Sequence, residues 1–194
     1  MSLAPWRSLL ARALHKNRSL PYARYFQLAT VRADGRPANR TVVFRGFLDD
    51  TNQVKIITDS RSQKACQIEP QSWGEACWYF PQTREQFRLA GQLTLVGADH
   101  PDPALKKARQ TTWQDLSDAA RLQFAWPDPG QEITQDDAAF SPPPPDPEQP
   151  LPNFCLLLLE PVQVDHLELR GDPQNRWIYH RNSSHDWFKQ AVNP

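Results

Sequence analysis

The sequence contains few glycines, and none of them falls in a pattern that binds a nucleotide. Its seven glycines form neither Gly-x-Gly-x-x-Gly, which holds dinucleotides in Rossmann folds, nor the Gly-x-x-x-x-Gly-Lys-Ser/Thr of phosphate-binding loops. The sequence also lacks Gly-x-Ser-x-Gly, the nucleophile motif of α/β-hydrolases, and His-Glu-x-x-His, a zinc motif of proteases. These absences argue against a Rossmann oxidoreductase, a P-loop enzyme and an α/β-hydrolase.

Cysteine is scarce as well. Cys66, Cys77 and Cys155 are scattered, odd in number and form no Cys-x-x-Cys pair, which argues against a disulfide framework and against a zinc site. We expect three buried, reduced thiols in a cytosolic protein. The five histidines show no spacing typical of metal ligands, so we expect no bound metal.

The sequence has no excess of charge and no long hydrophobic run. Its 22 basic and 22 acidic side chains cancel, whereas a general nucleic-acid binder needs an excess of Lys and Arg. We therefore expect no nucleic-acid partner, although a local basic pocket for one small anion stays open. No apolar run is long enough to span a bilayer, and residues 1–14 lack the features of a secretory signal. We expect no membrane partner and a cytoplasmic location.

The length and hydrophobic pattern predict a single domain over residues 1–194. Apolar residues recur at helical spacing over 5–16, inside an N-terminal helical region of residues 1–18. Residues 141–152 hold seven of the 19 prolines and are expected to form an extended loop. The expected strands cover residues 25–32, 38–47, 54–58, 75–80, 85–96, 153–169 and 176–181, and further helices cover residues 61–69 and 104–124.

Short strands with tight turns between them, and few long helices, predict a mainly β (α+β) fold. A barrel of six to seven strands with flanking helices fits this order of elements better than a doubly wound sheet does. Closure of the sheet also removes exposed strand edges.

The segment from Asp59 to Lys64 contains a candidate anion site. Ser60 and Gln63 have the spacing of a capping box, which places residues 61–64 in the first turn of a helix. A first turn normally prefers acidic residues, but here it carries Arg61 and Lys64. The free N–H groups of a helix start and these two cations together suit a phosphate. A basic turn exposed to solvent explains the same residues equally well.

Arginines also stand on both faces of the strand expected over 38–47. Because a strand alternates its faces, Arg40 lies on one face with Val42, and Arg45 lies on the other with Val43. The ordinary explanation is that each arginine reaches solvent at a strand end or pairs with a carboxylate. The alternative is that one or both bind a phosphate, which the planar guanidinium fits well.

The strand expected over 85–96 has an apolar face and a polar face. Phe87 and Leu89 begin the apolar face, which also contains Gly91, Leu93 and Leu95. Gln86 begins the polar face, which faces either solvent or a heteroaromatic ring or second subunit. Trp126 and Trp177 could border a ring-shaped ligand, with plain packing as their more ordinary role.

Taken in order, these segments resemble the pyridoxamine 5'-phosphate oxidase-like, FMN-binding split-barrel family, in particular a cyanobacterial and plant branch of undefined substrate. The resemblance covers roughly residues 20–192, and its ordered set of motifs is more specific than any single motif. The matching segments are Arg40-Thr41-Val42-Val43-Phe44-Arg45, Ile57-Thr58-Asp59-Ser60-Arg61-Ser62-Gln63-Lys64-Ala65, Glu85-Gln86-Phe87-Arg88-Leu89-Ala90-Gly91, Pro150-Leu151-Pro152-Asn153-Phe154 and Asn175-Arg176-Trp177-Ile178-Tyr179.

The resemblance implies a split barrel that forms a homodimer with flavin mononucleotide (FMN) at the subunit interface. Arg40, Ser62 and Lys64 would hold the FMN phosphate, with Gln63 where the family often has a second basic residue. Gln86 would come from the partner subunit, and Arg176 would lie near the isoalloxazine ring. The residues lining the ribityl chain and ring would be Thr41, Val42, Val43, Ile57 and Thr58, and Arg45 matches a family lysine near both flavin and substrate.

The activity implied is that of an FMN-dependent oxidoreductase acting on a small molecule, but the family's substrate residues are missing. Pro173-Gln174-Asn175 stands where the pyridoxal-phosphate enzymes have an Arg-x-His pair, and Leu167 replaces a tryptophan beside the flavin. The family's set of residues for the substrate phosphate has no counterpart around 122–130. The resemblance therefore supports FMN binding by this sequence more strongly than it supports the oxidation of pyridoxamine phosphate. Two alternatives remain, a non-catalytic flavin- or haem-type binding or sensor protein and a structural barrel that acts through its tryptophans and proline-rich loop.

Overall fold

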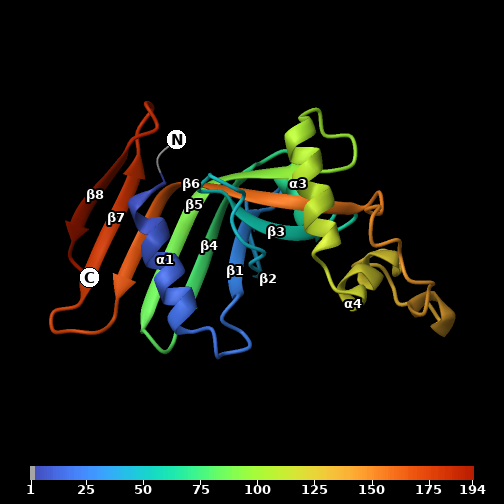
Figure 1. The fold of residues 1–194 in the computed structure, drawn as a ribbon, viewed down its shortest axis with the longest axis horizontal. Helices are drawn as coiled ribbons and strands as arrows, with labels where there is room; N and C mark the ends of the chain where they lie inside the picture. Colours follow the sequence, from blue (N-terminus) through green and yellow to red (C-terminus); the bar gives the residue numbers. More distant parts are fainter. Residues whose placement is uncertain (1–2) are drawn as a thin grey trace.

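The computed structural model describes residues 3–194 and consists of one antiparallel sheet with helices around it (Figure 1). Its eight strands are β1 (Tyr25–Val31), β2 (Pro37–Val43), β3 (Val54–Asp59), β4 (Trp73–Phe80), β5 (Glu85–Val96), β6 (Phe154–Glu168), β7 (Asn175–Arg181) and β8 (Trp187–Val192). Burial alternates along strands such as β3 and β5, because alternate side chains turn toward the core. The helices are α1 (Pro5–Lys16), α2 (Gln63–Ile68), α3 (Pro103–Gln114) and α4 (Asp118–Leu122), with 3-10 turns at Gln123–Ala125 and Asp137–Phe140.

The sheet divides at its longest strand, β6. The strand order is β2-β1-β4-β5-β6-β7-β8, and β3 pairs with β6 off this path. Residues 154–159 of β6 pair with β3, while residues 163–168 pair with β7. Both halves of β6 pair with β5 on the other side, with a shift of register between Ala90 and Gly91. This arrangement is the split barrel with flanking helices that the sequence predicted, with β8 as one strand more than expected.

The main core lies between α1 and the inner face of the strands. Trp78 of β4 is 1 % exposed and lies 5.0 Å, ring to ring, from Phe26, Phe44 and Phe80. Trp6 of α1 is fully buried against the same cluster. Rings of this size dominate the burial energy of a core. In Figure 1, α1 lies over the sheet, whereas α3 and α4 lie at the end remote from β7 and β8.

Most predicted elements are confirmed, but two strand predictions need correction. The chain predicted as strand 38–47 pairs with β1 only as far as Val43. It then turns at Gly46, whose φ of 101° is left-handed, so that Arg45 and Gly46 pair with Lys55. The missing strand is β8, whose side chains are mostly exposed and show no alternation of polar and apolar residues. Residues 141–152 form no helix or strand, as predicted.

The helix predictions were wrong in detail. Helix α2 begins at Gln63 with Ser62 in the N-cap position, so the predicted Ser60–Gln63 capping box is absent. The Ser62 hydroxyl instead donates to the carbonyl oxygen of Asp59 at 2.7 Å. The long helix predicted over 104–124 is interrupted at Ser117, which caps α4 by accepting from the N–H of Ala120. No helix in the described chain is long and apolar enough to cross a membrane.

The three thiols differ in their surroundings. Cys155 is buried in β6, as expected, and burial raises its pKa. Cys66 is exposed and Cys77 is half-buried, so the expectation of three buried thiols was wrong for these two.

Candidate functional site

A cleft of about 830 Å³ opens where β2 and β3 diverge. The two strands are joined only by the turn at residues 45–55; beyond it β2 pairs with β1, and β3 pairs with β6. One wall of the cleft therefore comes from β2, β3 and the turn into α2. The other wall comes from Ala120 to Thr134 together with Phe140. A volume of this size is in the range of cofactor and ligand sites.

Nine of the twelve residues predicted from the sequence line this cleft. Gln63 does not, because its side chain is exposed at the start of α2, and neither do Gln86 and Arg176. The nine that line it are Arg40, Thr41, Val42, Val43, Arg45, Ile57, Thr58, Ser62 and Lys64.

Lys64 is a half-buried cation without a carboxylate partner. Its Nζ donates to Thr58 Oγ1 at 2.9 Å and lies 3.5 Å from Ser62 Oγ. Among the described residues, no acidic group forms an ion pair with it within 4.0 Å. Burial, and next the nearby charge of Arg40, lower the pKa of Lys64. The charge of Asp59 offsets these effects only in part, so the ammonium group has lost water without gaining a paired counter-ion.

Arg40 is also without a counter-ion, but neutral acceptors hold it firmly. Its NH1 donates to Thr30 Oγ1 at 2.7 Å and to the carbonyl oxygens of Leu28 and Ala38, and its NH2 donates to Gln67 Oε1 at 2.9 Å. Its Nε has no hydrogen bond within the part of the chain described, so one edge of the guanidinium remains free. Burial, and next the charge of Arg32, lower the pKa of Arg40.

Arg45 places a third unpaired cation at the other end of the cleft. It follows Arg40 by five positions, which corresponds to roughly 16 Å along extended chain. Its Nε is shielded from solvent and has no acceptor in the described structure. Burial and the charge of Arg24 lower its pKa, although Tyr25 partly offsets them. Two cationic side chains, Arg40 and Lys64, thus lie at one end of the cleft, and one cationic side chain, Arg45, lies at the other.

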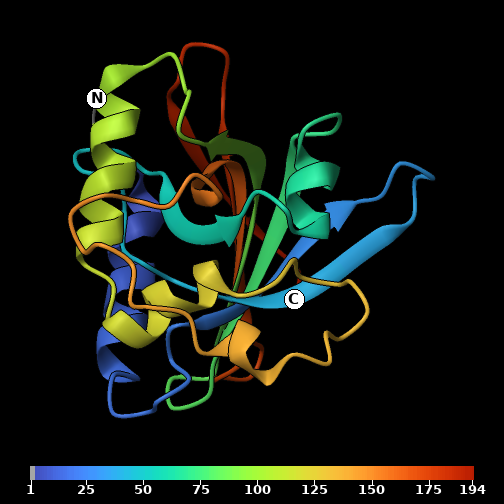
Figure 2. The same cartoon turned by 90° about the vertical axis from the view of Figure 1, so that its right-hand side faces the viewer.

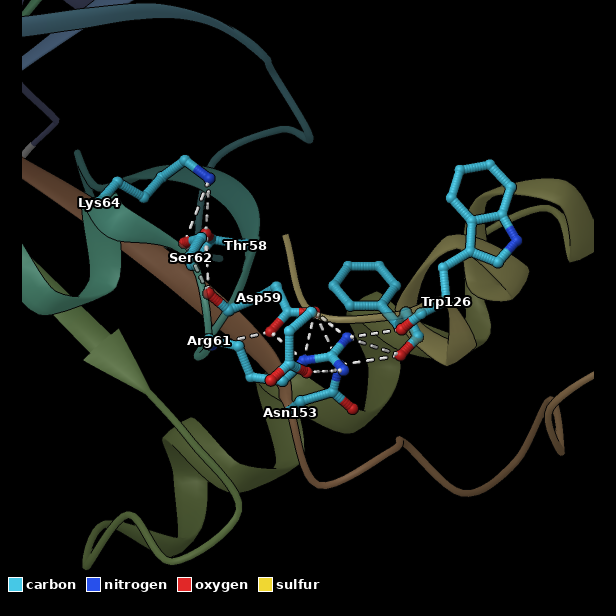
Figure 3. Close-up of polar contacts among 9 residues, drawn as sticks. Thr58, Asp59, Arg61, Ser62, Lys64, Trp126 and Asn153 are labelled. Carbon is cyan, nitrogen blue, oxygen red and sulfur yellow. Dashed lines mark hydrogen bonds and ion pairs between the residues drawn. The ribbon is translucent and has the colours of Figure 1, made fainter. Parts of the chain in front are cut away.

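Arg61 behaves differently from the other three. Its Nε and NH2 donate to the carboxylate of Asp59, with a closest distance of 2.7 Å, and its NH1 donates to Asp128 at 2.7 Å. These bonds raise the pKa of Arg61. Figure 3 shows its guanidinium turned away from Lys64, which points back over the turn toward Thr58 and Ser62. The basic turn predicted from the sequence therefore contributes Lys64 to the cleft as a free cation, and Arg61 as a paired one.

Gln86 and Arg176 lie together on the outer face of the sheet. Gln86 is opposite Leu167, and Leu167 is opposite Arg176, so all three share one face across β5, β6 and β7. Arg176 pairs with Asp165 at 2.7 Å, and this hydrogen bond raises its pKa. Within one chain neither residue reaches the cleft.

Most of the second wall, residues 120–134 with Phe140, was not predicted from the sequence. It contains Trp126, which the sequence suggested as a border for a ring-shaped ligand, and Phe140, whose ring lies 6.1 Å from it edge to face. The other tryptophan suggested in this way, Trp177, packs against the main core instead. In Figure 1 this yellow-to-orange segment lies beyond the ends of β2 and β3, and Figure 2 views it from that side.

A second cluster of polar groups lies outside the cleft. The side chains of Glu85, His166 and Glu168 bring their ligand atoms within 4.8 Å of one another. His166 Nε2 lies 2.9 Å from Glu85, and Arg12 lies 3.6 and 3.7 Å from the two carboxylates. Since Arg12 already pairs with both carboxylates and His166 contacts one of them, an ion-pair network explains the cluster.

Comparison with known proteins identifies the family of this chain. Residues 3–97 match a family model described as pyridoxamine 5'-phosphate oxidase, FMN-binding domain. A protein of Arabidopsis thaliana named pyridoxine/pyridoxamine 5'-phosphate oxidase 2 is 36 % identical over 194 residues, covering 99 % of this chain and 98 % of that protein.

Solved structures give the same result. A pyridoxamine 5'-phosphate oxidase-related, FMN binding protein from Nostoc punctiforme is 66 % identical, with a TM-score of 0.97 over 100 % of both chains. PhzG from Burkholderia lata has a TM-score of 0.78 at 20 % identity, over 96 % of this chain and 91 % of that one, and shares the fold alone. By its identity to the Arabidopsis protein over nearly the full length of both, the chain belongs to the pyridoxamine 5'-phosphate oxidase-like, FMN-binding split-barrel family.

Proposed function

We propose that this chain, as a single domain, binds FMN in the cleft between β2 and β3 and acts as a flavin-dependent oxidoreductase on a small molecule. The observation that carries the proposal is the set of partly buried cations without counter-ions, Arg40, Lys64 and Arg45. A buried charge is costly unless it is paired. A bound anion removes that cost, so the cleft is built for a ligand with negative charge.

A phosphate monoester suits the end of the cleft at Arg40 and Lys64. It carries about −1.5 to −2 charges at neutral pH, which matches two cations. Lys64 supplies a compact ammonium, while Arg40 supplies the free edge of its guanidinium. The hydroxyl of Thr58 accepts from Lys64 and can donate to a phosphate oxygen. The Ser62 hydroxyl also lies beside Lys64, but its one proton is already donated to the carbonyl oxygen of Asp59. The rest of FMN would lie along Thr41, Val42 and Val43 of β2 and Ile57 of β3.

The residues of the cleft have binding and orienting roles. A bound flavin supplies the electron-transfer chemistry itself, so no side-chain nucleophile is required. Arg45, two residues beyond the end of β2, would then face the ring end of the ligand. A cation there favours negative charge on the ring or on a substrate beside it.

We also propose that the protein is a homodimer with FMN at the subunit interface. This proposal explains Gln86 and Arg176, which lie on the outer face and cannot reach the cleft of their own chain. On that face Tyr79 stands opposite Gln86 and is 47 % exposed. Exposed tyrosines and arginines on a sheet face are typical of an interface. Gln86 of the partner subunit would then approach the flavin.

FMN binding is tested by titrating the apoprotein with FMN and with riboflavin while following flavin fluorescence. We expect the purified protein to be yellow and to release FMN on denaturation. We also expect FMN to bind at least about a hundredfold more tightly than riboflavin, because two charge-assisted contacts are worth about 1.5–3 kcal/mol each. A colourless protein with no FMN affinity contradicts the proposal, and equal affinities contradict the phosphate site.

The finer proposal, oxidation of pyridoxamine 5'-phosphate, has support from the name of the Arabidopsis relative. It is opposed by Pro173-Gln174-Asn175 and Leu167, which replace the family's substrate residues. The holoprotein should be assayed for pyridoxal 5'-phosphate formed from the amine and from the alcohol. If none forms and no other donor reduces the bound flavin, a non-catalytic flavin-binding or sensor protein is the better description.

Replacement of Gln67 by leucine tests whether the orientation of Arg40 matters. Gln67 Oε1 accepts from Arg40 NH2 at 2.9 Å and from Thr30 Oγ1 at 2.6 Å. Loss of one such acceptor is worth about 1 kcal/mol, so the Kd for FMN should rise about fivefold. The Kd for riboflavin should not change. The control is Gln110→Leu on the exposed side of α3, and an equal loss of affinity for both flavins would indicate a general structural effect.

A further inference from the structure

Arg61 is the one basic residue of the β3–α2 turn that has no place in the proposed FMN site. Its six side-chain hydrogen bonds go to Asp59, to Asp128 and to the carbonyl oxygens of Phe124 and Trp126. A guanidinium with so many acceptors has little capacity left for a ligand. Its position next to the cleft therefore needs another explanation.

These contacts tie the two walls of the cleft together. Asp59 ends β3, on the wall with Lys64, and Phe124, Trp126 and Asp128 belong to the other wall. Arg61 NH2 lies 2.7 Å from Asp59 Oδ2 and 3.2 Å from each of the two carbonyl oxygens. We call this set of contacts the Arg61 clamp (Figure 3).

Asn153 also connects the two walls of the cleft. Its Nδ2 donates to Asp59 Oδ2 at 2.7 Å and to the carbonyl oxygen of Phe124 at 2.9 Å. Burial opposes ionisation of Asp59, but the hydrogen bonds from Arg61 and Asn153 outweigh it and lower the pKa of this carboxyl. The carboxylate is thus ionised at neutral pH and acts as the centre of the clamp.

The burial of each side chain indicates which contacts of the clamp contribute most to its stability. The side chains of Asp59 and Arg61 are 14 % and 29 % exposed, whereas that of Asp128 is 60 % exposed. An exposed ion pair contributes little, whereas a mostly buried charge-assisted network contributes more. Beyond Trp126 every residue of the wall from 127 to 133 is exposed, so this stretch has few packing contacts of its own.

We propose that Arg61 is a positioning residue that fixes the wall of residues 124–134 across the cleft from the bound flavin, and so shapes the space for the second ligand. This inference rests on the proposed function, because the space exists only when FMN occupies the strand wall. Phe124 is held independently by packing with Trp113 and Phe154, whereas Trp126 and the residues after it depend on the clamp. Arg61 lines the cleft, but protein acceptors on the two walls already take its donors, so it acts through the wall.

The test uses Arg61→Ala and Arg61→Lys, with Asp128→Asn as the control that removes only the exposed arm. Three properties are measured: amide hydrogen exchange of residues 124–134 in the apoprotein, iodide quenching of flavin fluorescence in the holoprotein, and the Kd for FMN. In Arg61→Ala we expect exchange in the wall to accelerate about tenfold or more, since two carbonyls in part-buried contacts lose a charged donor. Iodide quenching should rise severalfold, and the Kd for FMN should change less than about threefold.

Arg61→Lys should give intermediate values, because an ammonium can pair with Asp59 but lacks the planar fork that reaches both carbonyls. It also keeps the test decisive if Arg61→Ala does not fold. Unchanged exchange and quenching in both variants would overturn the inference. A loss of FMN affinity with unchanged amide exchange in residues 124–134 would also overturn the inference, because Arg61 would then be a phosphate ligand. If the unmodified protein binds no FMN, the proposed function fails. If the amides of residues 124–134 are unprotected from exchange in the unmodified protein, the positioning role of Arg61 fails as well.

Discussion

Replacement of Lys64 by methionine is expected to weaken FMN binding about tenfold to a hundredfold, because a charge-assisted hydrogen bond is worth about 1.5–3 kcal/mol. The apoprotein should be at least as stable as the unmodified one. Burial lowers the pKa of Lys64, so its charged form is disfavoured in the fold, and no carboxylate in the described structure pairs with it. Methionine keeps the length of the side chain and removes that unpaired charge.

Two measurements separate function from stability in this variant. The Kd for FMN is obtained by fluorescence titration, and the Tm of the apoprotein is obtained by calorimetry. Lys107→Met, on the exposed surface of α3, is the matched control and should change neither value. If the Lys64→Met protein binds FMN with normal affinity, the FMN phosphate does not bind at this end of the cleft. A marked fall in the Tm of the apoprotein would show that Lys64 is a structural residue.

The comparison of Arg40, Lys64 and Arg61 shows what a sequence can and cannot predict about a site. The sequence offered each of the three for an anion site, beside the ordinary explanations of a solvated turn or a paired arginine. The family resemblance then gave the phosphate to Arg40 and Lys64 but not to Arg61. The structure separates them by their partners, since Arg61 has two carboxylates and the other two have none. Asp128 lies far from Arg61 in the sequence, so the pair depends on the path of the chain after α4, which no local pattern reveals.

The fold was more predictable than the boundaries of its elements. Strands with alternating burial, such as β4 and β5, were found at nearly their observed positions because period-two patterns are local. Strand β8 was missed because it lies at the edge of the sheet with both faces largely exposed. The start of α2 was misplaced because Ser60 and Ser62 both suit an N-cap, and the choice depended on the contact of Ser62 with Asp59.

The second wall of the cleft was the part least accessible to prediction. Residues 127–134 have no regular structure and little apolar periodicity, so nothing in their sequence places them near β2 and β3. Their position follows from the Arg61 clamp and from the packing of Phe124. A wall held by a few specific contacts can change in sequence while the strand wall stays constant.

Replacement of Tyr79 by aspartate is expected to separate the proposed dimer and to weaken FMN binding with it. Tyr79 begins the row on the outer face that continues through Gln86, Leu167 and Arg176. A tyrosine at the centre of an interface is commonly worth 2 kcal/mol or more, so the dissociation constant of the dimer should rise roughly thirtyfold or more. A carboxylate there would also be buried without a partner.

The two consequences of this substitution are linked by geometry. If the partner subunit supplies Gln86 to the flavin, FMN affinity must fall as the dimer dissociates and must recover at high protein concentration. Sedimentation equilibrium with and without FMN measures both effects, because a ligand bound between subunits strengthens their association. Tyr22→Asp is the matched control, since Tyr22 is 53 % exposed in the turn before β1. An unmodified protein that is monomeric at every concentration yet binds FMN tightly would rule out a shared site, and the outer face would then need another role.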